Sequence, residues 1–523
     1  YHEYGHGIND YRYGNSGMWN GALNEGYADI WGLSITQNPI LGLGVSLTDP
    51  NDYVRRYDID RKVYPQDIVG EVHADGEIIA GAWWDTYLGF NNMDSMMNLF
   101  KYTYDGAPDG PSGTEGAIYT DVLLEALMAD DNDGNIYNGT PNDQIIVDAF
   151  ALHGISLLSN ANIIHSQILS SFSNQDIQID ASISLTYAWA LSSAKAFYKL
   201  NNTATWNSIP LNNVGGTNYQ GVIPAQPAGT LIAYYLLLED SYGKQSGITP
   251  MAANLTQYPN IPYFILNGFE FMGIEDFDNN PGFWQTGDPS DNATTGQWEI
   301  DEPTGSFSDP TDPSTIVQTD EDHTPGSGND ECAFTGNAGL LDGIGTNDVD
   351  DGHTTLFSPF YDLTPYSNPV FTYYRWYTNN PPSGANPGAD WWQVMITDDG
   401  VNWQYVENNM TSDKSWRRFA FRVNDYVNLT NQVRVKFIAS DSTHLGQNLD
   451  GGSLIEAAVD DFSLYEEVFT SSLNNMDSKN AIRKLIKITD ILGREVDITK
   501  IKEETTLLYI YDNGTVEKRI VIE

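Results

Sequence analysis

The sequence predicts a multidomain fold class, with a mainly α-helical lobe first and all-β modules after it. Three observations support this prediction. In residues 1–156 apolar side chains recur at three- and four-residue spacing, which is typical of amphipathic helices. From about residue 157, apolar and polar side chains alternate between turn residues, which is typical of strands. At 523 residues the chain is also long enough for several domains.

Helical periodicity continues through most of residues 1–156. Apolar side chains at positions i, i+3, i+4 and i+7 form one face of such a helix. The pattern is present in "DGEIIAGAWWDTYLGF", "SMMNLFKYTY", "AIYTDVLLEALMAD" and "NDQIIVDAFALHGI". Several packed helices are therefore expected before residue 157.

The chain starts with the motif "HEYGH", which carries two histidines four residues apart. On a helix this spacing places the imidazoles of His2 and His6 on one face, close enough to share an ion. Glu3 points beside that face and can reach a water on the ion without being a ligand. The motif therefore supplies two zinc ligands and a candidate general base. The alternative is a coincidental match on a solvated helix.

A hydrolytic zinc site needs a third protein ligand and an open position. Glu25 is the candidate, because it lies nearby in "GALNEGYADIWGL", which has helical spacing. Asp29, four residues later, would accept the second N–H of a ligating histidine and fix its tautomer. Zinc is therefore the expected cofactor, held by His2, His6 and Glu25.

These segments resemble the gluzincin metallopeptidases, the thermolysin and fungalysin group. "HEYGHGI" is similar to the fungalysin zinc helix, and "GALNEGYADIWG" is similar to the glutamate helix of both families. "GEVHADGEIIAGAWWDTYLG" resembles the segment with the family's transition-state histidine. The resemblance implies that His73 donates a hydrogen bond to the developing oxyanion. Without it, His73 would be interpreted as a structural histidine.

The resemblance implies a secreted zinc endopeptidase, with residues 1–156 as the mainly α-helical catalytic lobe of a zincin. Glu3 would deprotonate the zinc water, which attacks a carbonyl of a protein or peptide substrate. The family's upper lobe and its substrate-pairing strand precede the zinc helix, so the sequence is expected to be a fragment of a longer precursor. The alternative function is a surface adhesin or glycan-binding protein with a vestigial peptidase lobe.

Charge and composition limit the function classes. The net charge of −46 argues against nucleic-acid binding, which needs a basic surface. No run of about eighteen apolar residues occurs, so no transmembrane segment is expected. The single cysteine, Cys332, excludes an intrachain disulfide. Its strand-like context favours a buried structural residue over a nucleophile.

The segment "DDNDGNIYNGTPND", between the last two predicted helices, resembles a calcium loop. Asp131, Asp133 and Asn135 would supply oxygens around a turn at Gly134. The EF-hand pattern fails, because Ala129 occupies its first ligand position. A solvated loop that caps the next helix is an equally good interpretation.

Two β-rich modules are expected after the helical lobe. Residues 157–265 resemble an immunoglobulin-like or fibronectin-like sandwich. Residues 270–466 have the strand spacing of a jelly roll, and they are similar to galactose-binding-like and MAM-like modules. Trp391, Trp392 and Trp403 would form a platform for a polysaccharide, although packing in the core is favoured for most of them.

The same predicted jelly roll contains acidic residues that would bind calcium through their carboxylates. These candidates are Asp348, Asp350, Asp460 and Asp461. Plain surface charge is the alternative, and the sequence favours neither interpretation.

Residues 481–523 differ in charge from the rest of the chain, because they carry 8 of its 25 lysines and arginines. "KLIKITDILGREVDITKI" and "LLYIYDNGTVEKRIVIE" are typical of short strands. The segment resembles the C-terminal sorting domain of the type IX secretion system of Bacteroidetes. The resemblance implies the type IX machinery as a partner, and a protein that is secreted or attached to the cell surface via the outer membrane. A plain β-hairpin tail is the alternative.

Overall fold

A computed structural model describes most of the 523 residues. The residues outside its description are 15–16, 46–49, 256–258, 276, 278–282, 308–314, 325–329, 340–343, 380–387, 412–413, 442–452, 469–484, 491–495, 497–504, 512–515 and 522–523. The chain forms two compact units, Tyr1–Val468 and Phe469–Glu523.

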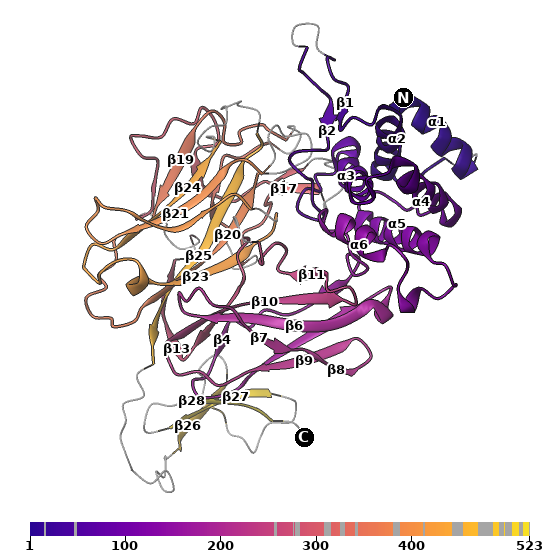
Figure 1. Ribbon diagram of the computed structural model, residues 1–523. Helices are drawn as coiled ribbons and strands as arrows, with labels where there is room; N and C mark the ends of the chain where they lie inside the picture. The colour runs from indigo at the N-terminus through magenta and orange to yellow at the C-terminus, as the bar shows by residue number, and fades with distance from the viewer. Residues whose placement is uncertain are drawn as a thin grey trace. The chain divides into compact units, whose positions relative to one another are not determined.

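Six α-helices lie before residue 152 in the described part of the chain (Figure 1). Three of them begin at Asn20, Glu71 and Asn92, whose side chains accept hydrogen bonds from the first free backbone N–H groups. The helices are α1 (His2–Tyr13), α2 (Gly21–Thr36), α3 (Val72–Phe90), α4 (Met93–Gly106), α5 (Glu115–Asp130) and α6 (Asp143–Ala151).

Glycines allow α1, α2 and α3 to pack backbone against backbone. A Cβ added to Gly5 of α1 would lie 2.6 Å from Cα of Ala28 in α2. A Cβ on Gly76 of α3 would lie 2.8 Å from the carbonyl oxygen of Ala22 and 3.1 Å from Cβ of Glu25. Both distances are shorter than a side chain tolerates, so these three helices cannot keep their spacing with a larger residue there.

A short antiparallel ribbon follows α2. It pairs β1 (Ile40–Leu41) with β2 (Arg55–Arg56), so that Leu41 lies opposite Arg55. The ribbon contacts α2 through β1. This contact brings Arg55 back to the helix that carries Glu25 and Asp29.

Two sheets follow the helices and enclose a common core; their strands pair antiparallel, except that β4 pairs with β12 in parallel. Strand β5 alternates buried and exposed residues, as expected for a sheet with one face on a core. The sheets have the orders β3-β5-β9-β8 and β4-β12-β10-β6-β7, with β11 paired to β10. Their strands are β3 (Asn162–Ile164), β4 (Ser170–Ser171), β5 (Ile177–Ser184), β6 (Leu191–Leu200), β7 (Asn207–Pro210), β8 (Asn212–Gly215), β9 (Asn218–Ile223), β10 (Thr230–Asp240), β11 (Gln245–Thr249) and β12 (Tyr263–Asn267).

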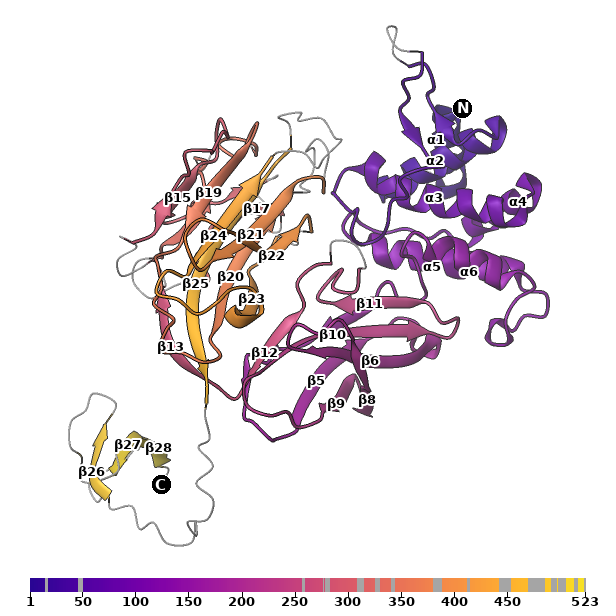
Figure 2. The same cartoon turned by 60° about the vertical axis from the view of Figure 1, so that its left-hand side comes forward.

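A second pair of sheets forms the next β-rich part, which Figure 2 shows as a layered body of its own. Its sheets have the orders β15-β18-β25-β20-β23, with β13 paired to β25, and β14-β19-β24-β21-β22. Phe371 and Phe437, one from each sheet, share its core. Its strands are β13 (Phe269–Glu275), β14 (Gln285–Thr286), β15 (Trp298–Asp301), β16 (Ser306–Phe307), β17 (Ile316–Gln318), β18 (Cys332–Thr335), β19 (His353–Phe357), β20 (Val370–Thr378), β21 (Trp391–Thr397), β22 (Gln404–Asn409), β23 (Arg417–Arg422), β24 (Arg434–Ser440) and β25 (Glu456–Glu467).

The carboxy-terminal unit contains one described antiparallel sheet of order β26-β27-β28. Its strands are β26 (Leu485–Asp490), β27 (Thr505–Tyr511) and β28 (Val516–Val521). Its assignment as a type IX sorting domain stays a prediction, and so does the location outside the cell.

The predicted fold class is wrong. It gave the chain a large, mainly α-helical catalytic lobe of a zincin, whereas 33% of the described residues are in strands and 23% are helical. The physical reason is that the core of the helices is continuous with the core of the first pair of sheets. Buried apolar side chains of the helices, such as Tyr119, form one cluster with those of the first sandwich, such as Ile179. Periodicity located the helices but could not show that they share a core with strands.

None of the helices in the described ranges is both long enough and apolar enough to cross a membrane.

The close contact at Gly76 leads to a testable prediction. We expect Gly76→Ala to lower the free energy of unfolding by about 1–3 kcal/mol, the usual cost of overpacking a tight contact. Gly7→Ala is the matched control, because a Cβ there would meet nothing within 4 Å. It should change stability by no more than about 1 kcal/mol, in the stabilising direction. Urea unfolding of both variants measures the difference, and equal effects would contradict the packing argument.

Candidate metal centre

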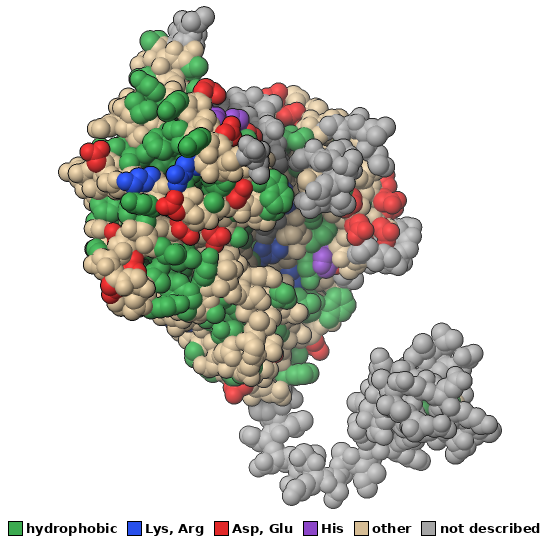
Figure 3. All heavy atoms as spheres, turned by 90° about the vertical axis from the view of Figure 1, so that its right-hand side faces the viewer, with side chains coloured by type: hydrophobic (Ala, Val, Ile, Leu, Met, Phe, Trp, Pro, Cys, Tyr) green, Lys and Arg blue, Asp and Glu red, His purple; other side chains and the backbone are tan. Residues whose placement is uncertain are grey.

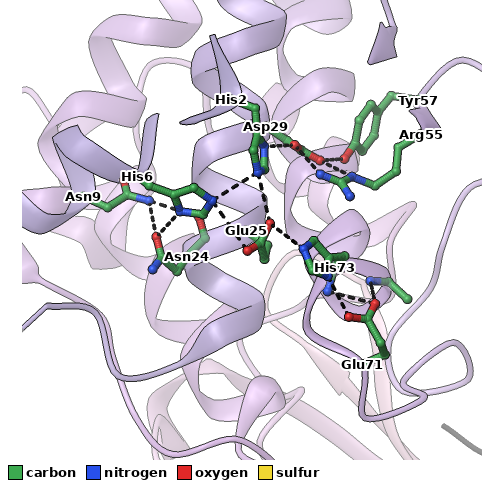
Figure 4. Close-up of polar contacts among 11 residues, drawn as sticks. His2, His6, Asn9, Asn24, Glu25, Asp29, Arg55, Tyr57, Glu71 and His73 are labelled. Carbon is green, nitrogen blue, oxygen red and sulfur yellow. Dashed lines mark hydrogen bonds and ion pairs between the residues drawn. The ribbon is translucent and has the colours of Figure 1, made fainter. Parts of the chain in front are cut away.

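Helices α1 and α2 bring His2, His6 and Glu25 together. Each offers one ligand atom, and the three atoms lie within 4.8 Å of one another. Nε2 of His2 is 3.1 Å from Nε2 of His6 and 3.2 Å from Oε2 of Glu25. Nε2 of His6 is 3.5 Å from Oε1 of Glu25. Figure 4 shows the three side chains pointing toward one another from two adjacent helices.

The outer ring nitrogens determine where the imidazoles carry their protons. Nδ1 of His2 lies 2.5 Å from Oδ1 of Asp29, and Nδ1 of His6 lies 3.0 Å from Oδ1 of Asn24. Both partners are acceptors, so each Nδ1 is the donor. In the neutral imidazole this leaves the lone pair on Nε2. The two Nε2 lone pairs and the Glu25 carboxylate then face one point.

This arrangement requires a positive charge among the three groups. Oε2 of Glu25 is buried, and its close polar neighbour is Nε2 of His2 at 3.2 Å. Without a metal, a proton on His2 would relieve the repulsion. The pKa of His2 is raised to about 9 by its hydrogen bond to Asp29 and then by that to Glu25. Two imidazoles and one carboxylate also fit the preference of zinc for nitrogen and oxygen ligands with an open position.

Asp29 connects His2 to a buried cation. Arg55 donates from Nε to Oδ2 of Asp29 at 2.7 Å and from a terminal nitrogen to Oδ1 at 2.8 Å. Tyr57 donates its hydroxyl to the same carboxylate. Burial acts to raise the pKa of Asp29, but the hydrogen bonds from His2 and Arg55 outweigh burial and lower it. Asp29 therefore stays ionised and holds His2 in one tautomer.

His6 has its own support on the other side. Asn9 donates from Nδ2 to Oδ1 of Asn24 at 2.7 Å, and this confirms that Oδ1 is the acceptor for His6. The hydroxyl of Tyr104 in turn donates to Oδ1 of Asn9 at 2.6 Å. Both rings are therefore fixed before any ion binds, which is typical of a pre-organised metal centre.

His73 reaches the same centre from the amino-terminal end of α3. Its Nε2 lies 3.5 Å from Oε2 of Glu25, and its Nδ1 lies 2.7 Å from Oε1 of Glu71. Glu71 also caps α3, because it accepts the backbone N–H groups of His73 and Ala74. Nδ1 therefore faces Glu71, and Nε2 is the ring nitrogen that faces the centre.

Glu3 is exposed beside these groups. It lines a cavity of about 460 Å³ together with His2, Arg55 and His73. Figure 3 shows histidine side chains at the surface of the helical part, next to acidic ones. The centre is therefore open to solvent on one side, as a hydrolytic site must be.

The sequence analysis identified the groups that face the common point but missed most of their supports. Glu71 stands two residues before His73 and caps α3, so local helix-capping chemistry could have indicated it. Asn24 lies inside α2, and its position next to Glu25 is its local signal. Arg55 and Tyr57 carry no such signal. They reach Asp29 only because the ribbon folds back on α2.

The loop predicted to bind calcium uses its oxygens internally. Oδ1 of Asp131 accepts the backbone N–H of Asp133, and Oδ1 of Asp133 accepts that of Asn135. Oδ2 of Asp133 accepts Nδ2 of Asn138. This pattern favours the alternative interpretation, a solvated loop held by short side-chain turns.

Asp460 and Asp461 are buried, so the surface-charge interpretation is wrong for this pair. Oδ1 of Asp460 accepts the backbone N–H of Asp461, and Oδ2 accepts that of His323. Oδ2 of Asp461 accepts Nδ1 of His323 at 2.6 Å. Both oxygens of Asp460 thus accept a backbone hydrogen bond.

Trp392 follows the interpretation that the sequence favoured, packing in the core, and not the platform alternative. Its side chain is fully buried in the core of the second pair of sheets, and Nε1 donates to Oε1 of Glu407 at 3.0 Å. Trp391 and Trp403 are half-buried. Cys332 is buried between the apolar side chains of Phe334 and Trp376, as the structural interpretation expects.

No family model and no curated protein matches the chain. The solved structures similar to part of it include carbohydrate-binding modules. TmCBM61, solved with β-1,4-galactotriose, is 13% identical with a TM-score of 0.21, and the match covers 37% of this chain and 99% of that one. The xylan-binding domain from CBM22 is 7% identical with a TM-score of 0.22, covering 38% and 94%. The CBM22-2 xylan-binding domain from Paenibacillus barcinonensis Xyn10C is 10% identical with a TM-score of 0.21, covering 37% and 98%.

The terms hydrolase and metalloprotease, which the sequence suggested for the whole chain, match none of these three structures, which are carbohydrate-binding modules by name. The term jelly roll is compatible with the second pair of sheets. The metal centre concerns the helices alone, and its interpretation depends on their geometry.

The geometry predicts one tightly held zinc ion per chain. After incubation with zinc and dialysis, elemental analysis should find about one equivalent, because three fixed ligands are present. His6→Ala should reduce the zinc content to the background. His353→Ala, which removes a histidine on β19, is the control and should keep the ion. Retention of a full equivalent by His6→Ala would contradict the assignment of the ligands.

Proposed function

We propose that α1, α2 and α3 form a zinc-dependent endopeptidase site. The observation that carries the proposal is the convergence of two imidazole nitrogens and one carboxylate on one point, with an exposed carboxylate and a histidine beside it. The spacing that resembles the gluzincins supports the same function. The zinc ion, when bound, would supply Lewis-acid polarisation of a carbonyl and would lower the pKa of a bound water.

Glu3 is proposed as the general base. It follows His2 on α1 and lines the same cavity, so it faces the open side of the centre without being a ligand. It would accept a proton from the attacking water and later pass that proton to the leaving nitrogen. One exposed carboxylate suffices for both transfers, because the proton only has to be held between the two steps.

His73 is proposed as the donor to the oxyanion. Its Nδ1 is occupied by Glu71, so Nε2 is the nitrogen that reaches toward the centre. A fixed donor aimed at the place where negative charge develops stabilises an oxyanion. Glu71 also holds the ring in place through its bonds to the first turn of α3.

The walls of the cavity suggest which side chains a substrate would present. Ile40, Leu41 and Val54 line it from the ribbon side, near Arg55. Apolar walls beside a fixed guanidinium fit an apolar side chain whose backbone carbonyl accepts a hydrogen bond. An extended peptide offers both groups on neighbouring atoms, so the cavity supports a peptide substrate.

The sharpest test separates proton transfer from metal binding. Glu3→Gln keeps the size of the side chain but cannot accept the proton. We expect the variant to keep its zinc and to lose cleavage of internally quenched peptides by at least about 10²-fold, the lower range for removing a general base. The rates of the zinc-loaded chain and the variant are measured side by side, with zinc content determined on the same samples.

His73→Ala provides the second arm of this test. It should lower kcat by about 10²–10³-fold with a smaller change in KM, as expected for loss of one oxyanion donor. If Glu3→Gln lost its zinc, Glu3 would be a ligand and the proposed roles would be wrong. Zinc-loaded chain that cleaves none of the peptides would contradict the endopeptidase proposal.

Glycan binding is the second candidate function, and the outer face of the sheet β14-β19-β24-β21-β22 favours it. Trp391 and Met395 project from β21 on the side opposite the buried Trp392. Trp403, just beyond β21, packs its ring against Phe357, with centroids 5.9 Å apart. Partly exposed aromatic faces can stack on the apolar faces of sugar rings.

Polar side chains surround these aromatic groups. Lys436 places Nζ 4.5 Å from the centroid of the Trp403 ring. Gln393 of β21 and Asn408 of β22 lie opposite each other, with their side chains 2.9 Å apart. Amide groups beside an aromatic ring suit the hydroxyl groups of a neutral polysaccharide.

We expect the double variant Trp391→Ala and Trp403→Ala to lose affinity for polysaccharide by at least about tenfold, which corresponds to about 1.4 kcal/mol. Affinity electrophoresis in gels that contain xylan or β-1,4-galactan measures the retardation. Trp19→Ala is the control, because Trp19 is exposed in the helical part. Equal retardation of the wild type and the double variant would contradict binding at this face.

A further inference from the structure

A buried carboxylate without a side-chain partner marks a second site, in the jelly roll and independent of the proposed zinc centre. Asp348 is only 1% exposed, and within the described structure no side chain pairs with its carboxylate, although the backbone N–H of Ile455 lies near it. Burying an ionised carboxylate without a partner is costly, so such groups are paired, protonated or bound to a cation. Asp348 therefore calls for one of these explanations.

Glu456 is a second buried acid beside Asp348. The backbone N–H of Val349 donates to the carbonyl of Ile455 at 3.1 Å, so the two segments run side by side there. Asp348 is next to Val349 in the sequence, and Glu456 is next to Ile455. Oε2 of Glu456 accepts Nε2 of Gln318 at 2.8 Å and the hydroxyl of Thr335 at 3.2 Å. Both partners are neutral, so neither balances the charge of the carboxylate.

Gln318 adds an oxygen to the same place. Its Nε2 is surrounded by three acceptors: the carbonyl oxygens of Thr335 and Gly336 and the carboxylate of Glu456. These acceptors fix the orientation of the amide. Its Oε1 is buried and accepts no hydrogen bond. Because the two ends of an amide are about 2.3 Å apart, Oε1 lies within about 5 Å of the Glu456 carboxylate.

The electrostatics of the cluster point in the same direction. Burial raises the pKa of Asp348 to about 7, and the charge of Asp350 adds to the effect. Burial also raises the pKa of Glu456 well above its ordinary value, and the charge of Asp348 adds to that. Two buried acids whose ionised forms are disfavoured thus lie close together, and either a proton or a cation would relieve the repulsion between them.

We propose that Asp348, Glu456 and Oε1 of Gln318 bind a calcium ion. The donor set consists of oxygens alone, which suits a hard cation and is a poor match for zinc. Asp348 and Glu456 do not belong to a group of three acidic or histidine side chains with ligand atoms within 4.8 Å; among the described residues that group is His2, His6 and Glu25. The calcium ion would therefore have to draw the two carboxylates and the amide oxygen toward itself, and water would complete its shell.

The ion would connect three segments that are distant in the sequence. Gln318 ends β17, Glu456 begins β25, and Asp348 lies in the loop before β19. Thr295 also reaches this loop, because its hydroxyl donates to the carbonyl oxygen of Asp348 at 2.8 Å. Calcium would thus act as a cross-link for a part of the chain that has no disulfide.

The competing explanation is a proton shared by the two acids. Terbium separates the two explanations, because it binds at calcium sites and its emission is sensitised by nearby tryptophan. Trp298 lies opposite Thr335 in the pairing of β15 with β18, so it is close to the proposed ion. The full chain is titrated with terbium after treatment with a chelator, and calcium is then added to displace it.

We expect sensitised emission from the wild type that calcium abolishes, and its loss in Asp348→Asn. Calcium at about a hundred times its Kd should also raise the Tm of the wild type by about 5–10 °C, and should not raise that of the variant. In chelator, Asp348→Asn should be at least as stable as the wild type, because it removes an unpaired buried charge. Asp460→Asn is the matched control, since both oxygens of Asp460 accept backbone N–H groups. This control should keep the terbium signal.

Three results would overturn the proposal. Emission that persists in Asp348→Asn would place the ion elsewhere, and its loss in Asp460→Asn alone would place it at the other acidic pair. A Tm that is unaffected by calcium in the wild type but falls as the pH rises from 5 to 8 would establish the shared proton instead. The Tm would fall with rising pH because a carboxyl group whose pKa is raised by folding loses its stabilising proton as the pH increases.

Discussion

The proposed zinc centre depends on how closely α1 approaches α2. At Gly5 and Ala28 the two backbones are so near that an added Cβ would lie 2.6 Å from the opposite Cα. That distance is what allows His2 and His6, one turn apart on α1, to face Glu25 on α2. A wider separation would leave the three groups in solvent, where each could be satisfied by water. The tight packing is thus a condition for any metal chemistry there.

The same closeness creates an electrostatic demand. Lone pairs and a carboxylate that face one point repel one another unless a cation lies between them. The surrounding residues strengthen this repulsion, because Asp29 and Asn24 accept hydrogen bonds from Nδ1 of both imidazoles and so leave the lone pairs on the inner Nε2 atoms. Arg55 keeps Asp29 ionised and in place. The jelly roll shows a related situation at Asp348, where burial leaves a carboxylate without a side-chain partner. In both places a buried negative group lacks a neighbouring positive charge, and this lack is what points to a bound cation.

How much the sequence could predict depends on how local each feature is. The helical spacing of His2 and His6 and the position of Glu25 are local, so the motif indicated them. The role of Arg55 depends on a ribbon that folds back on α2, and no local pattern reports that. The fold class failed because periodicity detects helices but not the core that they share with strands. Core packing was already favoured for most of the tryptophans, and Trp392 fits it, whereas the sequence left Asp460 undecided because alternation along one strand does not say which face is buried.

X-ray absorption at the zinc edge tests the central claim most directly, because it measures the ligands of the ion itself. The account predicts a first shell of two imidazole nitrogens and one carboxylate oxygen at about 2.0–2.2 Å, with one further light atom from solvent. The characteristic scattering of imidazole rings should be present for two histidines. A shell of six oxygens, or one without imidazole scattering, would contradict the centre built by His2, His6 and Glu25.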